Sequence, residues 1–223
     1  MSRILHIDTT TSRLMLGLSD GDVMISRFTA PCDSHRYHSA ILTPAIRDLL
    51  AESGTSVRDL SGLAVNLGPG SFTGIRTGII TVRTMAQFLN LPLYGINTFE
   101  ILALGRTRPL AIYLDALRLR SYHAVLHYGE DGPVYSQEPC LQMLSSEGNM
   151  PPEGADLLTS PTLAPLFPSQ HAEQIGEDFY PDAMLDLIQS YGPFFKQPWQ
   201  EVKPLYLQAP SITLKKTVTP RLE

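Results

Sequence analysis

Cysteine and positive charge are both scarce in this sequence. Only two of the 223 residues are cysteines, Cys32 and Cys140, and they form no C-x-x-C pair. They therefore predict neither a disulfide framework nor a redox or metal site. Lysine and arginine total 17 against 22 aspartates and glutamates, a net charge of −5. Because nucleic-acid binding depends on dense basic patches, RNA is expected to need charge from a partner.

Long apolar runs are absent as well. No run approaches the length of a membrane span, and the N-terminus turns polar at Asp8 after few apolar residues, unlike a secretory signal. The isolated cysteines fit a reducing compartment. We therefore expect a cytoplasmic globular protein without a membrane partner, containing one large core or two modest ones.

Glycine is missing where a phosphate-binding loop would need it. Asp8 ends the first β-type run and precedes three threonines, and Asp115 ends a similar run later in the chain. A loop that closes its backbone amides on phosphate normally contains glycine, and neither aspartate is followed by one nearby. We interpret Asp8, Thr10 and Asp115 as at most vestigial nucleotide-loop positions, with structural turns favoured. No P-loop or G-x-G-x-x-G motif is present.

Two other kinds of site, a metal site and a serine hydrolase site, receive little support. His35 and His38 have a spacing that could ligate one metal from a helix, but no third ligand follows at a defined spacing, so we expect no metal site. The stretch Gly70-Ser71-Phe72-Thr73-Gly74 has the wrong offsets for a serine hydrolase elbow. The sequence thus indicates no catalytic residues.

The most informative stretch is Gly68-Pro69-Gly70-Ser71-Phe72-Thr73-Gly74-Ile75-Arg76-Thr77-Gly78. It follows an apolar run and opens a segment of helical periodicity, which predicts strand, tight turn and helix, with Ser71 or Thr73 as N-cap. Gly70, Gly74 and Gly78 share one face, and each helical glycine costs about 1 kcal/mol against alanine. That cost implies an anion bound at the helix start, a close backbone approach, or simply a sharp junction inside a core.

The rest of the chain reads as two halves. Three β-type runs with an Asp-Gly turn begin residues 1–105 and predict an antiparallel meander. A helix over residues 41–50 begins at Thr43 with Pro44 in its first turn, or near Ser39 with a bend. A polar hinge at residues 105–109 suggests a boundary. Residues 106–223 start again with an apolar strand ending in Asp115, which indicates a weak structural repeat.

These residues resemble the TsaB (YeaZ) family. The resemblance is carried in order by Ile4-Leu5-His6-Ile7-Asp8-Thr9-Thr10, His38-Ser39, the highly specific Gly68 to Gly78 run, Leu114-Asp115-Ala116 and Lys203-Pro204-Leu205-Tyr206-Leu207. It is close over residues 1–105 and weaker beyond. The chain departs from the family at Ala116 to Tyr122, where Ala-Arg-Arg-Gly-Glu-Val-Tyr is usual.

The resemblance implies an α/β, actin-like ATPase fold, also described as sugar-kinase-like or ribonuclease-H-like, with two related βαβ subdomains. It implies a non-catalytic subunit, required for threonylcarbamoyl transfer to the adenosine next to the anticodon of tRNA. The implied partners are a TsaD-like catalytic subunit, which would carry the ATP and metal ion, and a TsaE-like ATPase. A homodimer is implied when the protein is alone, with tRNA bound only through the complex and no cofactor of its own.

The family uses the helices before and after the glycine-rich run as its interface. The residues implied to meet a partner are therefore Ile41, Ala45, Leu49, Ser71, Phe72, Gly74, Ile75, Arg76, Gly78, Ile79 and Val82. The resemblance therefore implies that the glycine stripe at Gly74 and Gly78 lets a helix of the partner approach closely. Two alternatives stay open: an active phosphotransferase using the loops at Asp8 and Asp115, and a metallo-glycopeptidase using His35 and His38.

Overall fold

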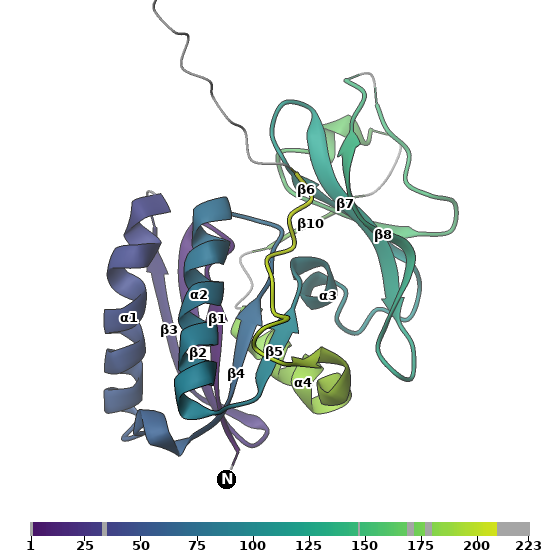
Figure 1. Ribbon diagram of the computed structural model, residues 1–223. Helices are drawn as coiled ribbons and strands as arrows, with labels where there is room; N and C mark the ends of the chain where they lie inside the picture. The colour runs from purple at the N-terminus through teal and green to yellow at the C-terminus, as the bar shows by residue number, and fades with distance from the viewer. Residues whose placement is uncertain (1, 33–34, 147, 169–171, 177–179, 209–223) are drawn as a thin grey trace, which may run out of the picture.

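The computed structural model describes residues 2–32, 35–146, 148–168, 172–176 and 180–208, without the side chains of residues 35–37. The larger of its two sheets has the strand order β11-β5-β4-β1-β2-β3 (Figure 1). Its strands are β1 (Arg3–Asp8), β2 (Arg13–Asp20), β3 (Val23–Pro31), β4 (Leu60–Asn66), β5 (Leu93–Ile96) and β11 (Lys196–Gln197). Strands β1, β2 and β3 form the predicted antiparallel meander, while β1, β4 and β5 run parallel.

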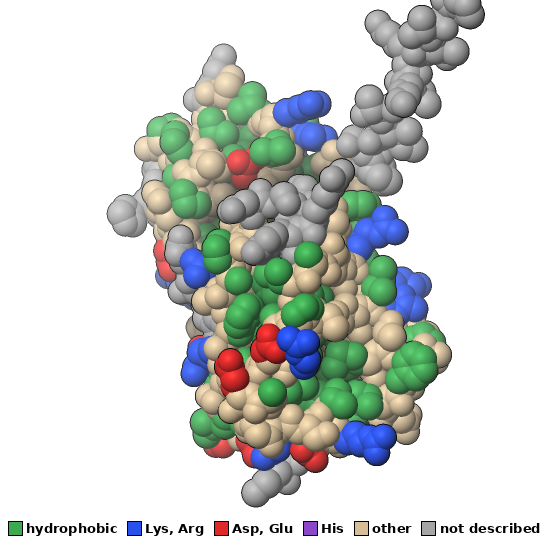
Figure 2. Space-filling model, turned by 90° about the vertical axis from the view of Figure 1, so that its left-hand side faces the viewer, with side chains coloured by type: hydrophobic (Ala, Val, Ile, Leu, Met, Phe, Trp, Pro, Cys, Tyr) green, Lys and Arg blue, Asp and Glu red, His purple; other side chains and the backbone are tan. Residues whose placement is uncertain are grey.

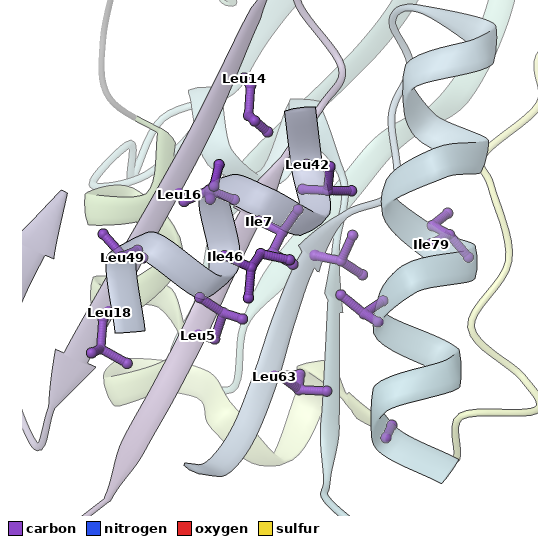
Figure 3. Close-up of a cluster of buried hydrophobic side chains, with 14 of the residues drawn as sticks. Leu5, Ile7, Leu14, Leu16, Leu18, Leu42, Ile46, Leu49, Leu63 and Ile79 are labelled. Atoms are coloured by element: carbon purple, nitrogen blue, oxygen red, sulfur yellow. The ribbon is translucent and has the colours of Figure 1, made fainter. Parts of the chain in front are cut away.

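Helices α1 (His35–Glu52) and α2 (Phe72–Leu89) lie side by side on one face of this sheet (Figure 1). Their inward leucines and isoleucines meet those of β1, β2 and β4 in a dry core, which Figure 3 shows around Leu5, Ile7, Leu42, Ile46 and Ile79. Such burial of an amphipathic helix face supplies most of the stability of helices in proteins.

The starts of α1 and α2 can be compared with those predicted from the sequence. Ser71 is the N-cap of α2, as predicted, and its side chain accepts a hydrogen bond from the Gly74 amide. The predicted start of α1 was wrong, because the helix begins at His35 and contains Pro44. Ala40 and Pro44 both face solvent. Water can therefore satisfy the carbonyl that proline leaves without a donor.

The opposite face of the sheet is covered by α4 (Tyr180–Phe195), which contacts β1, β2 and β5, with the short α3 (Thr98–Leu102) packed beside it. Met184 and Leu187 of α4 are fully buried. Residues from 180 onward therefore return to the first sheet after the chain has built the second.

The second sheet has the order β10-β9-β6-β7-β8. Its strands are β6 (Leu110–Asp115), β7 (Arg120–Tyr128), β8 (Pro133–Met143), β9 (Asp156–Thr159) and β10 (Glu173–Gln174), and two short 3-10 helices, η1 (Val57–Asp59) and η2 (Ala164–Leu166), complete the fold. In both sheets an antiparallel meander is extended on its first strand by a parallel strand: β4 beside β1, and β9 beside β6. The two halves thus repeat one topology.

The halves share a core. One buried cluster contains Ile4 and Ala64 of the first sheet, Ile112 and Leu126 of the second, and Phe99 of α3. The proposed boundary between residues 105 and 106 stays a prediction. Within the described ranges no helix is long and apolar enough to cross a membrane.

Candidate functional site

The outer surface of α1 and α2 contains an apolar hollow. A hollow of about 640 Å³ lies between the two helices, and its lining includes Ile46, Arg47 and Leu50 of α1 and Ile80, Thr81 and Thr84 of α2. Ile80 is 60% exposed. Arg47 is the one charged residue in the described lining, and its guanidinium pairs with Asp48 at 2.8 Å. Figure 2 shows the molecule from the side on which α1 lies in Figure 1, and hydrophobic side chains there are interspersed with charged ones.

A smaller hollow of about 350 Å³ continues along α2 around Phe72, Arg76 and Ile80. The Phe72 ring stacks on Tyr206 with centroids 5.0 Å apart, and the Arg76 guanidinium lies 5.5 Å from the Phe72 centroid. Phe72 remains 40% exposed. The start of α2 therefore presents an aromatic and cationic cluster beside the apolar hollow, a combination common at protein interfaces.

The predicted interface residues divide into two groups. Phe72 and Arg76 are exposed, and Ser71 and Ile41 are half-buried. The others are buried within the monomer: Ala45, Leu49, Gly74, Ile75, Gly78, Ile79 and Val82. These residues are enclosed by their own chain in the monomer, and their assignment as interface residues stays a prediction. They form the core beneath the face rather than the face itself.

The glycine stripe is in close contact with a loop of the same chain. A Cβ atom on Gly74 would overlap the carbonyl oxygen of Thr9, and one on Gly78 would lie 2.5 Å from the Thr9 hydroxyl oxygen. That hydroxyl donates a hydrogen bond of 2.8 Å to the Gly74 carbonyl. The backbone that approaches the glycines is therefore the chain's own loop between β1 and β2.

Asp8 lies at the centre of this closed junction. Its Oδ1 accepts hydrogen bonds from the Thr10 amide at 2.8 Å and the Thr10 hydroxyl at 2.9 Å, and its Oδ2 accepts from Asn66 Nδ2 at 2.6 Å. Burial raises the pKa of the Asp8 carboxyl, and these three bonds oppose the rise. Both oxygens are already occupied, so the side chain offers little to a metal or phosphate ligand.

The glycine-rich turn is fastened to the same loop. The Ser71 amide donates to the Thr10 carbonyl at 2.6 Å, and the Gly68–Pro69 peptide bond is cis. Thr98 joins the turn from α3, donating to the Pro69 carbonyl at 3.0 Å. Sequence reasoning missed Asn66 and Thr98, although a polar residue ending the apolar run of β4 was a visible signal.

Asp115 ends β6 of the second half as Asp8 ends β1 of the first, but its hydrogen-bond partners are different. It accepts hydrogen bonds from the Leu117 amide at 2.7 Å and the Thr162 hydroxyl at 2.7 Å. Leu117, Arg118 and Leu119 follow with positive φ values of 64°, 57° and 57°, a run that L residues rarely adopt. Asp115 thus caps a tight left-handed turn at the point where the sequence departs from the family pattern.

The predicted absence of a metal site at His35 and His38 stays a prediction. His38 is buried in α1, whereas the His35 side chain lies outside the described residues. In the part of the chain that the structure describes, no group of three or more His, Cys, Asp or Glu side chains is placed to hold a metal.

Comparison with known proteins shows what this chain is similar to. Residues 29–132 match the family model of TsaD, tRNA N6-adenosine threonylcarbamoyltransferase. The TsaB protein of Escherichia coli (strain K12), named for tRNA threonylcarbamoyladenosine biosynthesis, is 36% identical over 143 residues, which are 61% of this chain and 60% of that protein. The TsaB protein of Bacillus subtilis (strain 168) is 34% identical over 100 residues, which are 45% of this chain and 43% of that protein. YeaZ from Pseudomonas aeruginosa has a solved structure with TM-score 0.76 and 22% identity, covering 93% of this chain and 100% of that one. These similarities support the resemblance of this chain to the TsaB (YeaZ) proteins.

The similarity to the solved YeaZ structure supports the fold, and the matched segments limit what else follows. The chain has the α/β, actin-like and ribonuclease-H-like ATPase fold of the TsaB family, built here from two mixed sheets. The matches span 60% and 43% of the length of the two TsaB relatives. The outer α1–α2 face belongs to residues 35–89, inside the segment that the TsaD family model matches.

Proposed function

We propose that this chain is a non-catalytic scaffold subunit, which binds a TsaD-like catalytic subunit and is required for threonylcarbamoyl transfer to the adenosine next to the anticodon of tRNA. In this proposal ATP and a metal ion are held by the TsaD-like partner, and a TsaE-like ATPase completes the assembly. tRNA binds only through the complex, in the cytoplasm, and the chain alone forms a homodimer.

The observation that carries the proposal is the outer α1–α2 face. It combines a hollow lined mainly by apolar atoms with an exposed isoleucine, Ile80, and with the Phe72–Arg76 cluster at its end. Helix pairs bind one another by packing ridges of side chains into such grooves. A partner built on the same fold offers a complementary pair of helices, and a second copy of this chain offers another.

The non-catalytic role is supported by the junction at Asp8. The carboxylate bonds to Thr10 and Asn66, and the turn after β4 is fastened against Thr9 and Thr10. A nucleotide entering here would have to replace bonds that the fold already makes. This observation disfavours the phosphotransferase alternative.

The test is Ile80→Asp, measured for binding to a purified TsaD-like protein. Because Ile80 is 60% exposed, the change should leave the melting temperature of the monomer nearly unaltered, since surface changes usually stay within about 0.5 kcal/mol. A charge inside a packed interface should weaken binding at least about tenfold. Val134→Asp is the matched control, an exposed apolar residue (47%) on β8 of the second half.

Normal binding by Ile80→Asp, or equal weakening by both variants, would remove the α1–α2 face from the proposal. Sedimentation of the same variants without partner tests the homodimer, which should dissociate with Ile80→Asp alone. Modification of tRNA in a reconstituted system should require the chain and should fail with Ile80→Asp.

A further inference from the structure

Three cations lie where the chain after β11 runs along α2. They are Arg76 and Arg83 of α2 and Lys203, and we call them the cationic row. Arg76 and Lys203 are exposed, and Arg83 is half-buried. Among the described residues none of the three has a carboxylate partner. By comparison, Arg27 of β3 pairs with Asp182 of α4 at 3.0 Å.

Aromatic rings position the two arginines of the row. The Arg83 guanidinium lies 5.7 Å from the centroid of the Trp199 ring, and the Arg76 guanidinium lies 5.5 Å from that of Phe72. A ring attracts a cation without cancelling its charge. Both guanidiniums therefore keep a full positive charge and donors that match the oxygens of a phosphate group.

Tyr206 adds an open aromatic ring to the row. It stacks on Phe72 with ring centroids 5.0 Å apart, yet 45% of Tyr206 remains exposed. The contact with Phe72 fixes the orientation of the ring, and the exposed part is left for another flat group. Because every nucleobase has such a flat face, a ring of this kind accepts bases of any sequence.

The local charge is opposite in sign to that of the whole chain. The chain has a net charge of −5, but residues 60–99 contain two arginines and no aspartate or glutamate. Residues 198–208 contain Lys203 and a single acid, Glu201. Arg76 and Arg83 are seven residues apart, about 10 Å along a helix, so one strand can reach both. Unpaired cations beside an exposed ring are the features that bind single-stranded nucleic acid.

We propose that the cationic row contacts an unpaired stretch of RNA, with Arg76, Arg83 and Lys203 on phosphates and a base stacked on Tyr206. The inference rests on the proposed function, because it takes this RNA to be the tRNA that the complex modifies. Three cations bind RNA only weakly by themselves, so the row adds to binding by the complex. It borders the α1–α2 face at the Phe72–Arg76 cluster, which lets a partner and RNA be held together.

The experiment measures binding of a short fluorescent single-stranded RNA to the complex of this chain with a TsaD-like protein, at several salt concentrations. Arg83→Gln and Lys203→Gln should each weaken binding about three- to tenfold at low salt and lower the slope of log Kd against log salt by about 0.7. Tyr206→Leu should weaken binding and leave the slope unchanged, because it removes stacking but no charge. The control, Arg27→Gln, removes a cation with a 52% exposed side chain beside α4, on the opposite face of the first sheet, and should bind normally.

Competition and crosslinking identify what the row binds. RNA that carries 4-thiouridine should crosslink to the peptide containing Tyr206. A polyglutamate peptide that displaces the RNA efficiently would overturn the proposal, because the row would then be a general anion site. A duplex RNA that binds as tightly as the single strand would overturn it too, since paired bases cannot stack on Tyr206. Unchanged affinity and slope in Arg83→Gln and Lys203→Gln, or an equal loss in Arg27→Gln, would have the same consequence.

Failure of this inference can be told apart from failure of the proposed function. Assembly with the TsaD-like protein is measured first, without RNA. If no complex forms, the proposed function fails, and crosslinking of the isolated full chain at high concentration still decides on the row. Ile80→Asp should prevent assembly and leave that crosslink unchanged. If the complex forms and RNA binding ignores the row variants, only this inference fails.

Discussion

Gly78 and Thr9 are in contact because the loop between β1 and β2 rests directly on α2. A hydrogen atom at position 78 leaves just enough room for the Thr9 hydroxyl, which is 2.5 Å from where a Cβ atom would lie. That distance is well below van der Waals contact, and the hydroxyl is tied to the Gly74 carbonyl at 2.8 Å. The loss of helix propensity at glycine is thus balanced by a contact inside the monomer.

Gly78→Ala should therefore destabilise the monomer by about 1–3 kcal/mol through overpacking, despite the better helix propensity of alanine. The matched control is Gly192→Ala in α4, where an added Cβ would meet only atoms at 3.9 Å. That change should be nearly neutral, because Gly192 lies beside the kink at Tyr191 and not in a regular helix interior. Urea unfolding of dilute monomer measures both. A Gly78→Ala variant as stable as the original chain would show that the loop can move away.

His6 is a buried histidine that the fold keeps neutral. It is fully enclosed on β1, its Nε2 lies 3.0 Å from the Ser19 hydroxyl, and burial lowers its pKa to about 3. The unfolded chain gains this proton near pH 6.5 and the folded chain does not. His6 therefore makes stability fall as the pH drops from about 6.5 toward 3, by about 1.4 kcal/mol per pH unit at most.

His6→Asn should remove this acid sensitivity, whatever it costs in packing. The measurable quantity is the difference in unfolding free energy between the variant and the original chain at pH 7.5, 6 and 5. That difference should shift in favour of the variant as the pH falls. A difference independent of pH would mean that His6 is protonated in the folded state as readily as in the unfolded chain.

At the scale of elements, the last described segment secures α2. After β11 the chain runs along this helix: Trp199 lies under the Arg83 guanidinium at 5.7 Å, Val202 is fully buried in the first core, and Tyr206 stacks on Phe72. The Leu205 amide also donates to the Leu67 carbonyl at 2.8 Å. The segment thereby covers the side of α2 that α1 leaves open.

Truncation separates these contacts from the remainder of the C-terminus. A chain ending at Gln208 keeps all of them and serves as the reference. A chain ending at Pro198 loses the burial of Val202 and both aromatic contacts and should lose about 2–5 kcal/mol of stability. Thermal unfolding measures both. Equal stability of the two truncated chains would show that the segment adds nothing to the core.

Local patterns predicted the elements well and their surroundings poorly. The meander, the cap at Ser71 and the helix after it followed from alternation, the Asp-Gly turn and helical spacing. The contact between Thr9 and Gly74, sixty-five positions apart, could not be predicted, because a close approach to a glycine stripe looks the same in sequence whether the approaching backbone belongs to a partner or to the same chain. The exposed hollow was missed because Ile80 and Thr84 lie opposite the periodic apolar face, where sequence gives no sign of a groove.

At the scale of the whole molecule, Glu100 joins the two halves. Its carboxylate accepts from the Asn97 amide at 2.7 Å and from the Tyr135 hydroxyl of β8 at 3.1 Å, and its carbonyl accepts from Tyr128 of β7 at 2.9 Å. Burial raises the pKa of Glu100 to about 7, and the charge of Glu138 adds to the rise. The folded chain therefore holds a proton here that the unfolded chain releases near pH 4.5.

This linkage has the opposite sign to that of His6. Stability from Glu100 is fully present below about pH 4.5 and is lost as the pH rises through about 7. Glu100→Gln should accordingly gain stability relative to the original chain from pH 5 to pH 7.5, by about 1–3 kcal/mol. Urea unfolding at those two values checks it. A constant difference between the two chains would mean that the carboxylate is charged at the junction throughout.

The return of the chain to its first sheet also determines when the first core can be completed during translation. Strand β1 is translated long before the helix that covers its second face, α4, which begins at residue 180. Val202, which completes the first core, is translated later still. Chains are made at about 5–20 residues per second, so the nascent first half waits on the order of ten seconds with an apolar sheet face uncovered. Nascent chains of this protein should therefore depend on chaperone protection until residue 202 has been translated.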